Sequence, residues 1–364
     1  MNPTVDASRR DAAPALDAPG RPNTPDIPDI PAEYVLDSDE IAELRTAATK
    51  LAEVYGSPSL PEFYDRALAA EELLPAGLRT FLLSYRRSER HAACLVHGFP
   101  VDEAGLGPTP GHWREAIHGR TARDQEVWLA LCGLVLGDPF GWVTLQEGRI
   151  IQNILPIRGD EDRQSGHGSE TLLEFHTEDG FHPNRCDYLM LMGLRNPDAV
   201  PTIVASVRDV RLADADRAVL AEDRFRIRPD TEHIRQLEAS APDHPALPRL
   251  RVMAERPVPT AVLSGDRLSP YLRIDRPFMD ALPGDTEAEA ALDRLMAELH
   301  RVQQDVPVGP GSLLIVDNYR AVHGRRPFTA RYDGTDRWLK KLTVSRNLRR
   351  NFSGYALDHP RVIV

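Results

Sequence analysis

The stretch FHTEDGFHPNRCDYL, residues 175–189, carries the strongest structural signal in the chain. It lies within residues 171–206, where β-branched and apolar runs are separated by short clusters of Gly, Pro and Asp, a pattern typical of an antiparallel β core. Successive side chains of a strand project to opposite faces, so His176 and Glu178 share one face. An imidazole beside a carboxylate supplies two of the three ligands of a common metal site.

A third candidate ligand lies far downstream. The segment DNYRAVHG, residues 317–324, places His323 just after an expected last strand over residues 312–316, in a turn bounded by glycine. With His176 and Glu178 it would complete a 2-His-1-carboxylate facial triad, which leaves three positions of an octahedral Fe(II) open for a chelating cosubstrate and O2. Arg337 follows, a fixed cation that can hold a carboxylate through two hydrogen bonds.

The rest of the chain indicates one large domain over residues 34–364. Residues 1–33 are rich in proline among small and acidic residues and predict a disordered arm. Residues 211–256 are dense in Arg, Asp and Glu, which predicts a partly helical insertion over the core that could serve as a lid. The other expected elements are helices over residues 37–55, 125–136 and 288–302 and strands over residues 92–101, 148–157, 256–263 and 271–274.

The charge balance excludes some classes of protein. The chain has 364 residues with 44 Lys plus Arg against 55 Asp plus Glu, a net charge of -11, so it lacks the basic footprint of a general nucleic-acid or membrane-surface protein. No run approaches the roughly 18–20 apolar residues of a membrane helix. Three widely spaced cysteines encode neither a disulfide framework nor a cysteine zinc site, so we expect a cytoplasmic protein.

At the candidate metal ligands the sequence resembles the clavaminate synthase-like branch of the Fe(II)/2-oxoglutarate-dependent oxygenases, and most closely its hydroxylases of free arginine and other basic amino acids. The resemblance covers roughly residues 90–350. It is strongest in FHTEDGFHPNRCDYL at 175–189, PYLRID at 270–275 and DNYRAVHGRRPFTARYDGTDRWLKK at 317–341. It implies a mainly β fold with flanking helices, a double-stranded β-helix or jelly roll, with His176, Glu178 and His323 at its open mouth.

The resemblance also implies roles for other residues. Arg337 matches the arginine that binds the distal carboxylate of 2-oxoglutarate, and Thr202 matches the threonine that supports it. Asp275 matches an acidic residue that meets the substrate side chain, although a simple pairing with a neighbouring arginine is an alternative. The residues implied in holding the substrate are therefore Asp275, Gln146, Glu178 and Lys341, with Gln146 at the substrate amine.

Two departures from the family pattern concern the substrate. The arginine hydroxylases carry a second acidic residue two positions after the first, where this chain has Pro277. The family often has a further arginine where this chain has Lys341, and lysine supplies the charge without the planar fork.

These features predict hydroxylation of C3 or C4 of a free L-amino acid, with Fe(II) as the metal, 2-oxoglutarate and O2 as cosubstrates, and succinate and CO2 as products. Arginine is the first expected substrate, followed by citrulline, lysine and ornithine, in specialised metabolite assembly. Desaturation and ring formation, which the family includes, stay open. A zinc hydrolase with a His2Glu site, which leaves Arg337 unexplained, and a non-enzymatic jelly-roll binding protein are the more remote alternatives.

Overall fold

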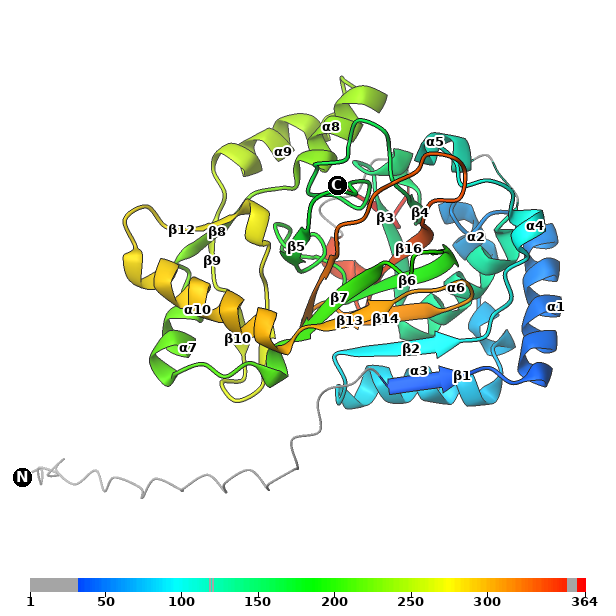
Figure 1. Ribbon diagram of the computed structural model, residues 1–364, viewed down its shortest axis with the longest axis horizontal. Helices are drawn as coiled ribbons and strands as arrows, with labels where there is room; N and C mark the ends of the chain where they lie inside the picture. Colours follow the sequence, from blue (N-terminus) through cyan, green and yellow to red (C-terminus); the bar gives the residue numbers. More distant parts are fainter. Residues whose placement is uncertain (1–31, 118, 120, 352–358) are drawn as a thin grey trace, which may run out of the picture.

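Two β-sheets form the centre of the molecule (Figure 1). The computed structural model describes residues 32–117, 119, 121–351 and 359–364. The larger sheet has the order β1-β2-β14-β6-β16-β3-β17, with β4 also paired to β16, and the smaller sheet has the order β13-β7-β15-β5. The larger sheet consists of β1 (Ala32–Val35), β2 (Ala93–His97), β3 (Asp138–Trp142), β4 (Ile151–Ile154), β6 (Tyr188–Arg195), β14 (Leu313–Asp317), β16 (Trp338–Ser345) and β17 (Val362–Ile363). The smaller sheet consists of β5 (Leu173–His176), β7 (Pro201–Ser206), β13 (Gln304–Pro307) and β15 (Ala321–Arg325).

The two sheets face each other across a buried apolar layer. This layer includes Leu95, Leu191, Leu314 and Leu339 of the larger sheet and Val204, Val306 and Ala321 of the smaller one. Apolar side chains that alternate along each strand reach this layer with one face, and burying them there removes them from water. The arrangement is the jelly-roll core with flanking helices that the sequence predicts.

Helices cover the outer face of the larger sheet (Figure 1). Met190 of β6 faces this helical side and packs with Leu44, Leu78 and Leu129, whereas its neighbour Leu191 faces the inner layer. The covering helices are α1 (Ser38–Tyr55), α3 (Ala76–Ser88) and α6 (Arg123–Leu136), with the short helices α2 (Pro61–Arg66), α4 (Glu103–Leu106) and α5 (Trp113–Ala116) beside them. A capping box formed by Asp37 and Glu40 begins α1, at the start of the helix predicted over residues 37–55.

A second apolar core joins the smaller sheet to the chain between β7 and β13. Phe175 and Val322 of that sheet pack there with Leu237, Leu272 and Leu295. The elements of this part are α7 (Asp214–Leu220), β8 (Phe225–Ile227), α8 (Thr231–Ser240), α9 (Ala246–Glu255), β9 (Pro259–Thr260), β10 (Leu263–Gly265), β11 (Pro270–Leu272), β12 (Met279–Ala281) and α10 (Thr286–Val302). Residues 211–256, hereafter the 211–256 segment, are therefore partly helical, as predicted.

One prediction about the strands is wrong. His323 lies inside strand β15 rather than in a turn after the last strand, and β16 and β17 follow. A glycine beside a histidine usually indicates a turn, but here a Cβ on Gly324 would clash with the carbonyl oxygen of Leu173. Gly324 is therefore required by the close approach of β15 to β5. At the other end of the chain, β1 begins at Ala32, and residues 1–31 of the expected arm lie outside the described residues.

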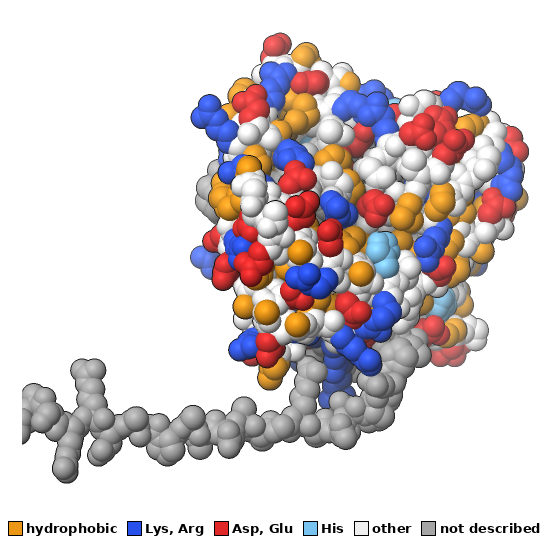
Figure 2. All heavy atoms as spheres, turned by 60° about the vertical axis from the view of Figure 1, so that its left-hand side comes forward, with side chains coloured by type: hydrophobic (Ala, Val, Ile, Leu, Met, Phe, Trp, Pro, Cys, Tyr) orange, Lys and Arg blue, Asp and Glu red, His pale blue; other side chains and the backbone are white. Residues whose placement is uncertain are grey.

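The surface agrees with the charge balance of the sequence. On the face shown in Figure 2, acidic and basic side chains are interspersed rather than segregated. Within the described part of the chain, no helix has the length and apolar character needed to cross a membrane.

Candidate active site

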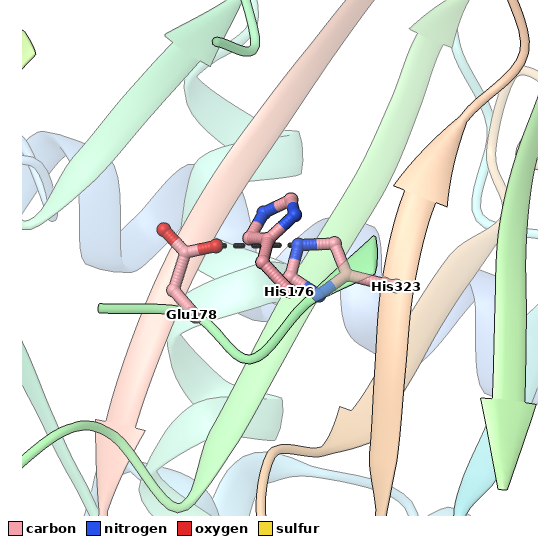
Figure 3. A group of neighbouring side chains, drawn as sticks. All are labelled: His176, Glu178 and His323. Carbon is pink, nitrogen blue, oxygen red and sulfur yellow. Dashed lines mark ion pairs between the residues drawn. The ribbon is translucent and has the colours of Figure 1, made fainter. Parts of the chain in front are cut away.

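The three predicted metal ligands meet at one end of the smaller sheet. The register of β15 against β5 places His323 directly opposite His176, with ring centroids 4.1 Å apart. Glu178 follows β5, and its Oε2 lies 3.3 Å from Nε2 of His323. One ligand atom from each residue lies within 4.8 Å of the other two, and Figure 3 shows the three side chains converging. The strand pairing therefore brings together residues that are distant in sequence.

Hydrogen bonds to the backbone of Glu174 and to the side chain of Asn318 orient this group. Nδ1 of His176 lies 2.8 Å from the carbonyl oxygen of Glu174, which favours an Nδ1–H tautomer and leaves Nε2 available for a metal. The backbone N–H of Glu178 donates to Oδ1 of Asn318 at 2.6 Å, and Nδ2 of Asn318 donates to the carbonyl oxygen of Glu178 at 3.0 Å. Asn318 thus fixes the backbone of Glu178, a contact that the sequence did not predict.

The protonation states suit a divalent cation. Burial, together with the nearby His323, lowers the pKa of His176 to about 3, so its imidazole is neutral. Burial alone would raise the pKa of Glu178, but the Lys341 ammonium and His323 hold it well below its usual range. Nζ of Lys341 donates to Oε1 of Glu178 at 2.7 Å. Two imidazoles and one carboxylate form a donor set that fits Fe(II).

Arg337 and Thr202 form a second buried group beside the three ligands. Nη2 of Arg337 donates to Oγ1 of Thr202 at 3.4 Å, and both side chains are buried. Burial and the neighbouring Arg325 lower the pKa of Arg337 to about 9. Among the described residues no carboxylate pairs with Arg337, and its Nε is buried without a partner. A buried cation with unused donors fits the distal carboxylate of 2-oxoglutarate.

All of the predicted site residues line one pocket. Arg337 precedes β16, and Lys341 lies within it on the same face, because side chains alternate along a strand. The intervening Lys340 points to the opposite side, where its Nζ lies 2.8 Å from Glu126. The pocket therefore contains two cations, Arg337 and Lys341, in addition to the three ligands.

Asp275 lies at the wall of this pocket, 6% exposed, across an isolated β-bridge from His176. Among the described residues no arginine or lysine pairs with its carboxylate, and Arg273 instead donates to backbone carbonyls of residues 180 and 181. Burial, followed by the negative charges of Asp230, Glu178 and Asp179, raises the pKa of Asp275 well above its usual value. The alternative in which Asp275 simply pairs with a neighbouring arginine is therefore not found among the described residues. The Asp275 carboxylate lines the pocket without a cationic partner there.

Asp230 supplies a second carboxylate that the sequence did not predict. It lines the same pocket from the N-cap of α8, where its Oδ1 accepts from the N–H of Glu232 at 2.9 Å. Burial raises the pKa of Asp230 to about 6. The one sequence pattern at Asp230 is that of a helix N-cap before Thr231. This pattern is hard to recognise among the many charged residues of the 211–256 segment. Pro277 occupies the position where the family pattern has its second acidic residue. In this chain a second carboxylate, that of Asp230, reaches the pocket wall from another part of the sequence.

Gln146 also lines the pocket, but its amide is engaged by the chain. Its Oε1 accepts from the N–H of Asn153 at 2.9 Å, and its Nε2 donates to the carbonyl oxygen of the same residue at 2.8 Å. One N–H and one lone pair of this amide stay available. The structure therefore places Gln146 at the predicted site while showing a structural use of the same side chain.

Comparison with known proteins agrees with this geometry. Residues 144–343 match the model of the family described as taurine catabolism dioxygenase TauD, TfdA family. The chain belongs to this family and is an Fe(II)- and 2-oxoglutarate-dependent oxygenase.

Among its relatives are hydroxylases of amino acids. The chain is 40% identical to an enduracididine beta-hydroxylase of Streptomyces hygroscopicus over 338 residues, which cover 90% of this chain and 98% of the relative. It is 42% identical to an L-ornithine/L-arginine 3-hydroxylase of Catenulispora acidiphila, over 80% of this chain and 87% of the relative. The crystal structure of the non-heme iron oxygenase OrfP in complex with Fe, succinate and (3S)-hydroxy-L-Arg matches with a TM-score of 0.84 and 38% identity, covering 91% of this chain and 99% of that one.

Proposed function

We propose that this oxygenase hydroxylates C3 of a free basic L-amino acid, with L-arginine as the first candidate, and forms succinate and CO2 from 2-oxoglutarate and O2. The observation that carries the substrate class is the pair of pocket carboxylates, Asp275 and Asp230, for which the described residues provide no cation. A guanidinium or ammonium group bound there would relieve the repulsion between them. The relatives that act on arginine, ornithine and enduracididine support the same class.

The proposed roles follow from the geometry. His176, Glu178 and His323 would ligate Fe(II), which would bind and activate O2, the oxidant needed to break an unactivated C–H bond. Arg337 and Thr202 bind the distal carboxylate of 2-oxoglutarate.

The substrate would be held at both ends. Lys341 attracts the α-carboxylate, Gln146 and Glu178 face the α-amine, and Asp275 with Asp230 holds the side-chain cation. Fixing the amino acid at both ends would place one side-chain carbon beside the metal. The position of that carbon would then determine which C–H bond reacts.

The experiment is reconstitution of the chain with Fe(II) and 2-oxoglutarate without oxygen, followed by admission of O2 with a panel of free L-amino acids. Arginine, ornithine, lysine, citrulline and enduracididine would be compared by succinate yield and product mass. We expect a gain of one oxygen on a basic amino acid, which is lost in His176→Ala. Loss of two hydrogens would instead establish desaturation or ring formation. Absence of stimulation by every amino acid would refute the substrate class.

We further propose that the enzyme works in the cytoplasm in the assembly of a specialised metabolite such as an antibiotic. Cys94, Cys132 and Cys186 are buried free thiols, as suits a reducing compartment. The resemblance to an enduracididine beta-hydroxylase supports the biosynthetic setting.

A further inference from the structure

One histidine of the 211–256 segment reaches the residue next to a metal ligand. Nε2 of His233, on α8, lies 3.1 Å from Oδ1 of Asp179, and Asp179 directly follows Glu178. Nδ1 of the same ring lies 2.6 Å from Oγ1 of Thr144. An Nε2–H tautomer donates to the carboxylate and accepts from the hydroxyl, so both ring nitrogens are satisfied. A helix outside the jelly roll is thereby bonded to the loop that carries Glu178.

The surroundings of His233 are built for this contact. Its side chain is 2% exposed, and its ring packs edge-on against Trp142 at 5.6 Å and Phe181 at 4.9 Å between centroids. These rings exclude water from the hydrogen bond to Asp179, and a charge-assisted hydrogen bond is stronger in such a setting. Neither the metal, the cosubstrate nor the pocket carboxylates require a histidine here.

The other oxygen of Asp179 is held by the core. Nε1 of Trp142, in β3, donates to Oδ2 of Asp179 at 2.5 Å. Asp179 has a φ of 52°, a left-handed conformation that aspartate adopts more readily than most residues, and hydrogen bonds from Trp142 and His233 hold both of its carboxylate oxygens. Because Asn318 holds the backbone of Glu178 on the other side, the position of Asp179 bears directly on the direction of the Glu178 carboxylate.

The same helix also forms part of the substrate pocket. Asp230 caps the start of α8, and Oε1 of Gln236, on α8, accepts from the backbone N–H of Gln146 at 2.9 Å. A movement of α8 would therefore displace Asp230 and break the His233–Asp179 bond together. Arrival of a cation at Asp230 and orientation of Glu178 would be parts of one event.

We propose that His233 is a positioning residue that latches α8, as a lid, onto Asp179 and so couples closure over the substrate to the orientation of the metal ligand Glu178. Closure would exclude water when the amino acid is in place, which keeps oxidation of 2-oxoglutarate tied to oxidation of the substrate. The latch concerns how the site closes. It applies to whichever basic amino acid occupies the pocket.

The first test is amide hydrogen exchange of the metal-free chain without any substrate. In His233→Ala, exchange in residues 231–240 should rise about ten- to hundredfold, the effect of removing one charge-assisted hydrogen bond from an opening equilibrium. His244→Ala is the matched control, because it removes a histidine of the same segment whose Nδ1 accepts from Ala246, outside the pocket. Unchanged exchange in His233→Ala would overturn the latch.

A second variant distinguishes loss of the His233–Asp179 hydrogen bond from a general folding defect of His233→Ala. Asp179→Asn weakens the same hydrogen bond from the other side, because the charge is lost and one side-chain oxygen is left for both His233 and Trp142, and asparagine tolerates the left-handed backbone. It should loosen residues 231–240 in the same direction as His233→Ala, and the double variant should loosen them no further than His233→Ala alone, since the change at residue 179 acts on these residues through His233. Additive effects of the two changes would overturn the latch.

The coupling itself is measured as the ratio of hydroxylated product to succinate formed. This part rests on the proposed amino acid substrate, whereas the exchange experiment is independent of it. In His233→Ala the ratio should fall clearly below that of the unaltered enzyme and of His244→Ala, while a merely destabilised enzyme would lose both products equally. An unchanged ratio would overturn the coupling role even if exchange increased.

Discussion

Replacement of Asp275 by asparagine tests the substrate class by removing one charge while keeping the shape of the side chain. Asp275 is 6% exposed and lines the pocket, so a bound cation would pair with it away from water. A hydrogen bond to a charged group contributes about 1.5–3 kcal/mol, which corresponds to about 10- to 150-fold in kcat/KM for L-arginine. For L-citrulline, whose ureido group is neutral, we expect a much smaller loss.

The assay measures product formation by mass spectrometry for both amino acids at several concentrations. Asp280→Asn is the matched control, because Asp280 is exposed and pairs with Arg228 on the surface. The ratio of kcat/KM for arginine to that for citrulline should fall at least about tenfold in Asp275→Asn and stay constant in the control. Equal losses on both substrates would refute the proposal that the Asp275 charge selects the side chain.

Three further predictions concern the cosubstrate, pH and stability. Arg337→Leu should raise KM for 2-oxoglutarate by about 100-fold, because one partner of a buried charge pair is lost, while the exposed Arg326→Leu should not; steady-state kinetics decide. Burial raises the pKa of Asp230 to about 6, so kcat/KM for arginine should fall as the pH drops through about 6 and this carboxylate becomes neutral; a pH profile that persists unchanged in Asp230→Asn would contradict this. Glu126→Ala leaves the buried ammonium of Lys340 without a carboxylate and with only Oδ1 of Asn153 as its hydrogen-bond acceptor, so urea unfolding should show a loss of about 3–5 kcal/mol with kcat/KM preserved at low temperature; a loss under 1 kcal/mol would count against the pair.

Much of the fold was predictable because local signals and tertiary structure agree. The capping box at Asp37 and Glu40 begins α1, and alternating apolar residues in β6 face the helices on one side and the inner layer on the other. Strand β15 was missed because its two apolar residues, Ala321 and Val322, are followed by a glycine that usually marks a turn. Its position between β7 and β5 supplies the hydrogen bonds that make it a strand.

The residues of the candidate site also fall into two groups, those that the sequence predicts and those that it does not. The pair His176 and Glu178 was predictable from its spacing, although β5 ends at His176 and Glu178 lies in the turn that follows rather than in the strand. Arg337 was predictable from its fixed charge and the family resemblance. Asp230 and Asn318 were not, because each acts through a partner distant in sequence: Asp230 through the pocket it shares with Asp275, and Asn318 through the backbone of Glu178. A single sequence contains no local pattern that marks such pairs.

The most direct test of the central claim is an anaerobic titration of the chain with Fe(II), followed by 2-oxoglutarate, in the unaltered protein and in His323→Ala. We predict one Fe(II) bound per chain and a metal-to-ligand charge-transfer absorption that appears only when 2-oxoglutarate is added, with both lost in the variant. Full binding of Fe(II) and 2-oxoglutarate by His323→Ala, or a bound metal that gives no absorption with 2-oxoglutarate in the unaltered protein, would contradict the account.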